Sequence, residues 1–142
     1  MKKLMIFLML ALVLILTPTC LFAANFVEIC SDDEISVFLD SSSIQDNGTY
    51  YRAWIKCEFK EGEKKKEGEI LGINKEVDYE LFLYAYAKKI KQTCILARYI
   101  YDKDGKMIKS FNYENLPLSW ESVVPESLGE LIILSVYSYA GK

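Results

Sequence analysis

Short segments in which apolar and polar residues alternate recur along this chain, and they constrain its fold more than any other feature. The clearest ones run from Tyr50 to Phe59 and from Tyr79 to Ala87, and both are rich in aromatic residues. Successive side chains of a β-strand point to opposite faces of the sheet, so this period of two indicates strands. Turn residues separate the segments; residues 46–49 include an Asn-Gly pair, which tolerates the positive φ of a tight hairpin. The pattern predicts an antiparallel sheet.

We expect about six strands, connected in chain order as a meander. They cover residues 26–29, 37–40, 50–59, 79–87, 93–101 and 106–111. In the third of these strands Ala53 and Ile55 fall on one face and Trp54 on the other, which indicates that the second face is not fully wet. The segment over residues 60–69 carries four lysines and four glutamates, and we interpret it as a mobile, solvated loop.

Near the C-terminus the apolar period changes from that of a strand to that of a helix. Apolar residues recur at helical spacing from Leu128 to Tyr139. Ser127 and Glu130 have the spacing of a capping box, and Pro125 precedes them as helix starts allow. A seventh strand stays open as the alternative, because isoleucine, valine and tyrosine also favour strands. The expected fold class is α+β, a mainly antiparallel sheet with a C-terminal helix packed on one face.

The first 24 residues have the composition of a signal peptide. Two lysines precede an apolar run over residues 4–16, and Ala23 and Ala24 supply the small residues of a cleavage region. The alternative, an uncleaved membrane anchor, needs about 20 apolar residues, and Thr17 and Pro18 interrupt this run sooner. We expect an exported chain, in the periplasm or on the cell surface. It would consist of one domain over residues 25–142 and meet the membrane only through its signal segment.

Charge and composition narrow the classes of function. The formal net charge is −3, which argues against a nucleic-acid partner because phosphate contacts need clustered cations. The chain has no histidine, and therefore lacks the commonest general base at neutral pH and the commonest zinc ligand. The turn around Asp102, Asp104 and Gly105 fits an EF-hand calcium loop at neither end. We predict no enzymatic activity, no metal and no cofactor.

Two groups of residues are candidates for binding a partner. Lys88, Lys89 and Lys91 form a basic hairpin tip with no acid nearby, which suits an acidic partner surface. A solvated turn is the ordinary explanation of these lysines. The second group is aromatic and comprises Trp54, Tyr84, Tyr86, Tyr99 and Tyr101. Exposed rings are typical of protein interfaces, whereas buried rings are ordinary core residues, and both alternatives stay open.

Three cysteines, Cys30, Cys57 and Cys94, follow the predicted signal segment. In a meander Cys30 ends the first strand and Cys57 nears the end of the third, which brings them to the same edge. A disulfide needs α-carbons within about 7 Å, so Cys30 with Cys57 is the one feasible pair, provided that no strand lies between them. Buried free thiols are the alternative.

Segments spread over nearly all of the chain after residue 24 carry a resemblance to a known family. They are residues 26–29, 31–33, 37–40, 43–44, 51–56, 83–84, 101–106, Trp120, Pro125 and residues 127–130. In order and approximate spacing these segments resemble the surface-adhesin protein E-like domains. The resemblance implies a small exported bacterial domain with an antiparallel sheet and a C-terminal helix packed on it.

The same resemblance implies a function. The namesake of the family is an outer-surface adhesin that binds host matrix and serum proteins and can dimerise. We therefore expect a non-enzymatic binding or adhesin-like protein, with a structural or assembly factor of the cell envelope as the alternative. Many members tie the helix to the sheet with a cysteine pair, at positions aligned with Ala87 and Tyr137 here. Since both cysteines are replaced, we expect apolar packing alone to hold the helix.

Overall fold

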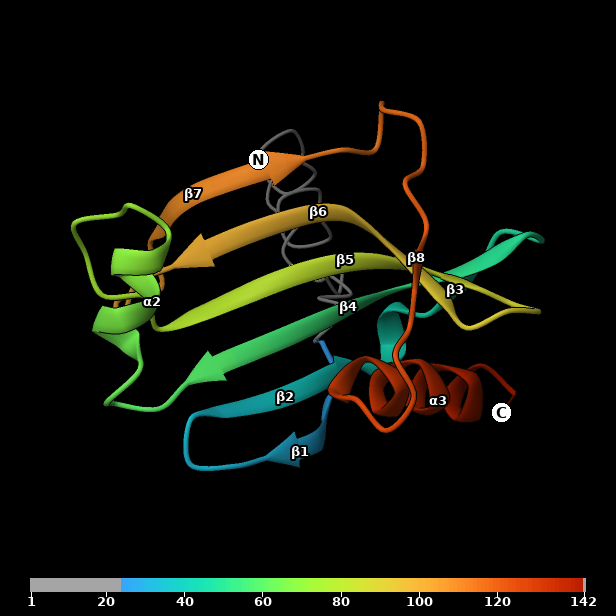
Figure 1. Cartoon of the computed structure of the whole chain (residues 1–142), viewed down its shortest axis with the longest axis horizontal. Coiled ribbons are helices and arrows are strands. Elements are labelled where there is room, and N and C mark those ends of the chain that lie inside the picture. The colour runs from blue at the N-terminus through green and yellow to red at the C-terminus, as the bar shows by residue number, and fades with distance from the viewer. Residues whose placement is uncertain (1–23, 142) are drawn as a thin grey trace, which may run out of the picture.

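The structure, a computed structural model, describes residues 24–141. These residues form one antiparallel sheet with two helices beside it (Figure 1). The strands are β1 (Phe26–Ser31), β2 (Ile35–Asp40), β3 (Gln45–Asp46), β4 (Tyr50–Phe59), β5 (Tyr79–Ala87), β6 (Gln92–Tyr101), β7 (Met107–Asn112) and β8 (Glu121–Ser122). The helices are α2 (Lys64–Ile70) and α3 (Leu128–Ala140), and a 3₁₀ turn, η1 (Ser41–Ser43), follows β2. Within this part of the chain no helix is long and apolar enough to cross a membrane.

The six longer strands lie in the order β1-β2-β4-β5-β6-β7, and all neighbours are antiparallel. The two-residue strands β3 and β8 pair with β4 and β6. The predicted α+β class and the meander are confirmed, and β4 and β5 have the predicted bounds. In the predicted Asn-Gly turn, Gly48 has a φ of 91°, which glycine adopts without steric cost.

Alternation along the strands gives the sheet two distinct faces. Ala53 and Ile55 of β4 are fully buried together with Ile133 and Val136 of α3. We call this side the helix face, because both α2 and α3 contact it. Trp54 points to the opposite side, which carries neither helix and which we call the open face. The buried residues of the open face form a smaller cluster, made of Leu83, Ala85, Cys94, Leu96 and Ala97.

Helix α3 is attached by apolar packing and by polar contacts. Ser127 caps it, since Glu130 N donates to Ser127 Oγ (3.3 Å). The second half of the predicted capping box differs, because Glu130 Oε2 accepts from Glu126 N (2.7 Å) instead. Towards the other end of α3 the Tyr137 hydroxyl donates to the backbone oxygen of Ala87 in β5. The predicted helix is confirmed, but the expectation that apolar packing alone holds it is wrong.

The prediction of a mobile loop between β4 and β5 is also wrong, because Lys64–Ile70 form helix α2. The alternating charges pair along the helix surface, as Lys66 does with Glu63 (2.8 Å). A backbone hydrogen bond ties the helix to the segment before β5, where Val77 N donates to Lys64 O (3.0 Å). The alternating charges that suggested a solvated loop therefore lie on the outer surface of a short helix that is held against the sheet.

Gly68 in α2 gives the first testable prediction. The residue is buried, and a Cβ atom added to it would lie 2.0 Å from the backbone oxygen of Lys75. Backbone must shift to relieve this overlap, so we expect Gly68→Ala to lower the free energy of unfolding by about 1–3 kcal/mol. Urea denaturation followed by circular dichroism measures the change. Gly62→Ala is the control, since a Cβ there meets nothing within 4 Å; an equal loss in both variants would contradict the prediction.

Candidate functional site

The open face presents a row of partly exposed aromatic rings. Phe26, Trp54, Tyr79, Tyr99 and Tyr101 come from β1, β4, β5 and β6, and we call them the aromatic strip. The register explains how they gather, because Tyr79 and Tyr101 are cross-strand partners and their rings stack with centroids 4.7 Å apart. The rings of Trp54 and Tyr99 lie 5.8 Å apart. Such pairs fix the orientation of the rings and keep the strip in place.

Lys56 of β4 places its charged group on the strip. Its Nζ lies 4.6 Å from the centroid of the Tyr79 ring and 5.6 Å from that of Phe26. The same Nζ forms an ion pair with Glu58. The faces of aromatic rings attract cations, so the strip already holds one cation whose charge a neighbouring acid neutralises.

A pocket of about 410 Å³ opens beside the strip, and we call it the aromatic pocket. It is lined by Ala24, Phe26, Asp40, Trp54, Leu81, Tyr99 and Tyr101. Asp40 supplies the one charged side chain of this lining and is 8% exposed. Its Oδ1 accepts hydrogen bonds from Asn25 N (3.0 Å), Ser42 N (3.1 Å) and Ser42 Oγ (2.6 Å). These bonds hold the carboxylate at the end of β2, with Phe26 as its cross-strand partner.

The structure separates the aromatic residues that the sequence grouped together. Trp54, Tyr99 and Tyr101 lie on the open face, but Tyr84 and Tyr86 pack with the cluster of the helix face. Tyr86 is 1% exposed, so the suggestion that it binds a partner is wrong. The reason is the pairing of β5 with β4, which places Tyr84 opposite Ala53 and Tyr86 opposite Tyr51. Phe26, which sequence reasoning did not single out, belongs to the aromatic strip instead.

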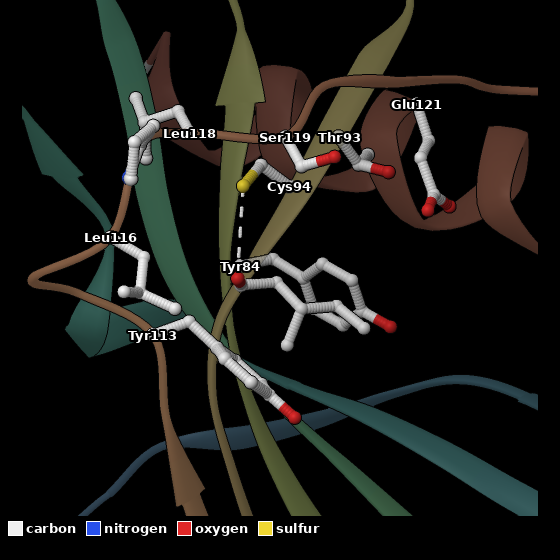
Figure 2. A pocket seen from close by; sticks show the side chains of 10 residues that line it. Tyr84, Thr93, Cys94, Tyr113, Leu116, Leu118, Ser119 and Glu121 are labelled. Carbon is white, nitrogen blue, oxygen red and sulfur yellow. Dashed lines mark hydrogen bonds between the residues drawn. The ribbon is translucent and has the colours of Figure 1, made fainter.

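Tyr84 lines a second pocket, of about 330 Å³, at the edge of β6 (Figure 2). We call it the edge pocket. β7 pairs with Ala97–Tyr101 of β6 and β8 with Gln92 and Thr93, and the pocket lies beside the residues between them. Figure 2 shows Leu116 and Leu118, from the segment that connects β7 to β8, beside this gap. In the same view the Cys94 thiol donates a weak hydrogen bond to the backbone oxygen of Ile95 (3.7 Å).

The basic hairpin tip is not a free cationic surface. Lys88 pairs with Asp46 and lies 4.8 Å from the centroid of the Tyr51 ring. Lys91 pairs with Glu130 of α3. The expectation of cations with no acid nearby is therefore wrong for both, because these acids are close in space and distant in sequence. Among residues 24–141, Lys89 is exposed and has no ion pair, so one lysine of the tip is left for an acidic partner.

The predicted Cys30–Cys57 disulfide is not formed. Cys30, Cys57 and Cys94 are all free thiols. Cys30 and Cys57 are both cross-strand partners of Val37, so β2 lies between their strands. Two strand spacings amount to about 10 Å, which exceeds the α-carbon separation that a disulfide allows. Burial raises the pKa of the Cys57 thiol to about 12, and an inert buried thiol is the result.

A buried ion pair on the helix face lies outside the predicted sites. Glu80 is 1% exposed and accepts from Arg98 Nε (3.0 Å) and Nη2 (2.7 Å), and Glu67 of α2 lies 3.5 Å from the same Nη2. The guanidinium also lies over the Phe82 ring, 5.3 Å from its centroid. Burial raises the pKa of Glu80, and the contact with Arg98 partly offsets the rise. The sequence signal was an acid on the same strand face as Phe82 and the buried Tyr86.

Both acids of this cluster are directed at one guanidinium, so the arrangement joins α2 to the sheet and provides no separate acid and base. Within residues 24–141 no group of three or more cysteine, aspartate or glutamate side chains is placed to hold a metal ion. Of the predicted cleavage region, Ala23 lies outside the described residues and Ala24 lines the aromatic pocket. In comparison with known proteins, no family model, no curated protein and no solved structure matches this chain.

Proposed function

We propose that this chain is an exported cell-envelope protein that binds another protein through the open face of its sheet, without enzymatic activity. The observation that carries the proposal is the aromatic strip. Aromatic side chains offer large, rigid contact areas and dominate the energetics of protein interfaces. Phe26 remains 38% exposed and Met107, at the Tyr101 end of the same face, 50% exposed. Exposed apolar side chains gathered on a face without a helix are typical of an interaction site.

A contact between α3 and β5 supports the resemblance to the surface-adhesin protein E-like domains. The positions aligned with the cysteine pair of those domains are Ala87 and Tyr137, and here the Tyr137 hydroxyl donates to the oxygen of Ala87. Two positions that are bonded in one protein and in contact in another are what a shared arrangement of helix and sheet would produce. With the signal-like first 24 residues, this favours a protein partner outside the cytoplasm, such as a host matrix or serum protein.

Binding measurements with the purified chain test the proposal. The chain from Asn25 on is suitable, because residues 25–141 contain both apolar clusters of the sheet. We expect saturable binding to at least one protein in a panel of immobilised matrix and serum proteins, measured by surface plasmon resonance. The double variant Phe26→Ser/Tyr101→Ser is expected to weaken that binding about tenfold or more, because it removes two rings of the strip.

A matched control separates loss of the surface from general loss of apolar area. Leu131→Ser on α3 removes a side chain of similar exposure, 43% against 38% for Phe26, and is expected to leave binding unchanged. An equal loss of affinity in the control, or no binding to any protein of the panel, would contradict the adhesin-like role. Sedimentation of the free chain tests a homodimer as the occupant of the open face, and dissociation of that dimer by the double variant would assign the face to a second copy.

The alternative, a structural or assembly factor of the cell envelope, is favoured by the edge pocket. β7 and β8 pair with the two ends of β6, so a part of this edge between them has no strand neighbour. Such a free strand edge can accept a strand from another protein. In this role the chain would recover envelope proteins of its own organism in pull-downs. Substitution in the aromatic strip would not affect that recovery, whereas Ile95→Ser, at a side chain lining the edge pocket, would reduce it.

A further inference from the structure

We propose that the edge pocket binds an uncharged sugar residue of a glycan. The inference goes beyond the proposed function, because Tyr84 and Ile95 of this pocket lie on the helix face, whereas the aromatic strip lies on the open face. It follows from three features of the pocket: the polar side chains that strand pairing gathers there, the lack of partners for those side chains, and the apolar wall beside them.

Strand pairing brings the polar groups of the edge pocket together. Thr93 of β6 is the cross-strand partner of Glu121 in β8, so the two side chains project on the same face of the sheet. Ile95, two residues further along β6, pairs in the same way with Tyr84 of β5. Tyr113 is held beside them, because its backbone N donates to a backbone oxygen of β6 (2.8 Å). Three strands and the segment after β7 therefore fix the lining of the pocket.

The polar side chains of this lining have no partners within residues 24–141. Neither a hydrogen bond nor an ion pair is formed there by the hydroxyls of Tyr84, Thr93, Tyr113 and Ser119 or by the carboxylate of Glu121. Tyr84 is the most informative of them, since burial raises its pKa to about 12 and the charge of the nearby Glu121 adds to the rise. A phenol hydroxyl in such surroundings usually has a hydrogen-bond partner. A ligand that both donates and accepts hydrogen bonds would supply it.

The pocket also has an apolar wall. In Figure 2 Leu116 and Leu118 lie on one side of it, and the Glu121 carboxylate lies on the other. The Tyr113 ring stacks on Phe111, with centroids 6.3 Å apart, and is therefore held in place. A sugar ring has the same division, because its C–H groups form an apolar face and its hydroxyls form a polar rim. Each of those hydroxyls donates one hydrogen bond and accepts up to two, as the hydroxyls of the pocket do.

The charges around the pocket decide which sugars can enter. Among the described residues that line it, Glu121 is the only carboxylate, and no lysine or arginine is present. A carboxylated, sulfated or phosphorylated sugar would bring a second negative charge with no cation to balance it. The hydroxyls of an uncharged sugar can instead donate to the Glu121 carboxylate, and such a bond is stronger than one between neutral groups. An ammonium ligand would also pair with Glu121, but it has no acceptor atom for the hydroxyls of the pocket.

Matched pairs of methyl glycosides test the inference directly. The neutral members are the methyl glycosides of glucose, galactose and mannose, and the charged members are the corresponding uronates, which carry a carboxylate at C6. Titrated into the purified chain, at least one neutral glycoside is expected to shift the NMR signals of the Tyr84 and Tyr113 rings in a saturable way. Its uronate is expected to bind about tenfold more weakly or not at all, because Glu121 repels it. Equal affinities within the pair, or no saturable shift by any neutral glycoside, would overturn the proposal.

Two substitutions of glutamates provide the matched control. Glu121→Gln removes the charge and keeps an oxygen acceptor, so the uronate is expected to bind within about threefold of the neutral glycoside. Glu114→Gln makes the same change at an acid that pairs with Arg52 and does not line the pocket, and is expected to leave the discrimination unchanged. Tyr84→Phe removes one hydroxyl and keeps the ring, and is expected to weaken the neutral glycoside about three- to tenfold. Unchanged discrimination in Glu121→Gln, or unchanged affinity in Tyr84→Phe, would contradict the proposal.

Two further measurements distinguish the sources of the sugar. Binding to immobilised serum glycoproteins that is lost after their enzymatic deglycosylation and reduced by Tyr84→Phe would assign the pocket to a host glycan. Binding to purified envelope polysaccharide of the same organism, reduced by the same variant, would assign it to the cell envelope. Either result supports the inference.

The outcomes keep this inference and the proposed function apart. Protein binding that depends on Phe26 and Tyr101, together with no shift by any neutral glycoside, would retain the docking surface and remove the sugar. Recovery of envelope proteins that depends on Ile95, again with no shift by a glycoside, would assign this edge to an added strand and overturn the inference. Saturable binding of a neutral glycoside, with no binding to any protein of the panel, would support the pocket and count against the adhesin-like role.

Discussion

Replacement of Arg98 by methionine is expected to lower the free energy of unfolding by about 3–5 kcal/mol, because it leaves Glu80 buried without its counter-charge. Glu80 is 1% exposed, so water cannot replace the two hydrogen bonds that the guanidinium donates. The same substitution removes the contact between the sheet and Glu67 of α2. Urea denaturation at pH 7, followed by circular dichroism, measures the loss.

The control for this prediction is an ion pair of similar length at the surface. Arg52 and Glu114 approach to 2.8 Å, but both side chains are about one-third exposed. Since water solvates both groups when the pair is broken, Arg52→Met is expected to cost less than about 1 kcal/mol. Similar losses in the two variants would mean that the Glu80 carboxylate is compensated by something other than Arg98.

The stability of the chain is expected to fall steeply above pH 9. Burial raises the pKa of Cys57 from 9.0 to about 12 and that of Tyr84 from 10.0 to about 12, and it raises the pKa of Tyr86 well above 10. Below pH 9 these groups keep their protons in both states, so their contribution to stability is complete. As the pH rises, the unfolded chain releases the protons first and stability is lost until the folded pKa is passed. By pH 11, Cys57 and Tyr84 together should cost about 4 kcal/mol.

Urea unfolding at several pH values between 8 and 11 tests this prediction. Three substitutions show which groups cause the loss of stability. Cys57→Ala and Tyr84→Phe each remove one of the two titrating groups and are expected to flatten the fall. Tyr86→Phe should flatten it further at little cost near pH 7, because the Tyr86 hydroxyl is buried without a hydrogen-bond partner in the described part of the chain. Tyr113→Phe, at an exposed ring, is the control. A stability that stays level to pH 11 would contradict the prediction.

The parts of the fold that the sequence predicts well are those with long, regular periodicity. β4 and β5 have the expected bounds, and their alternation places Ala53 and Ile55 in the core and Trp54 on the open face. α3 follows from its apolar spacing and its capping residue, Ser127. In each case a local pattern decides the structure, because period and burial on one face are properties of a single segment.

The features that the sequence does not predict depend on contacts between distant segments. The acids that neutralise Lys88 and Lys91 lie 42 and 39 residues away in the sequence. Likewise, Cys30 and Cys57 cannot form a disulfide because β2 lies between β1 and β4, and this is known only once the strand order is known. α2 is missed for a related reason, since its charged residues show no apolar stripe and its anchors are a backbone hydrogen bond and the contact of Glu67 with Arg98.

The candidate site was predictable only in part. Trp54 and the tyrosines of β6 were recognisable as an aromatic group, but strand register decides which rings share a face. Phe26 begins β1 and Asp40 ends β2, so they become neighbours only through the pairing of the two strands. A polar residue that closes a strand beside an aromatic cross-strand partner is a usable signal, and it could have been found once the hairpin was assumed.

The bond from the Tyr137 hydroxyl to the Ala87 carbonyl has a consequence for how the chain matures. A disulfide at these two positions would make helix docking depend on an oxidant. Here a hydrogen bond from a phenol makes this contact, and Cys30, Cys57 and Cys94 are free thiols. The terminal helix can therefore dock on the sheet without an oxidoreductase, and within residues 24–141 reductants have no crosslink to cleave.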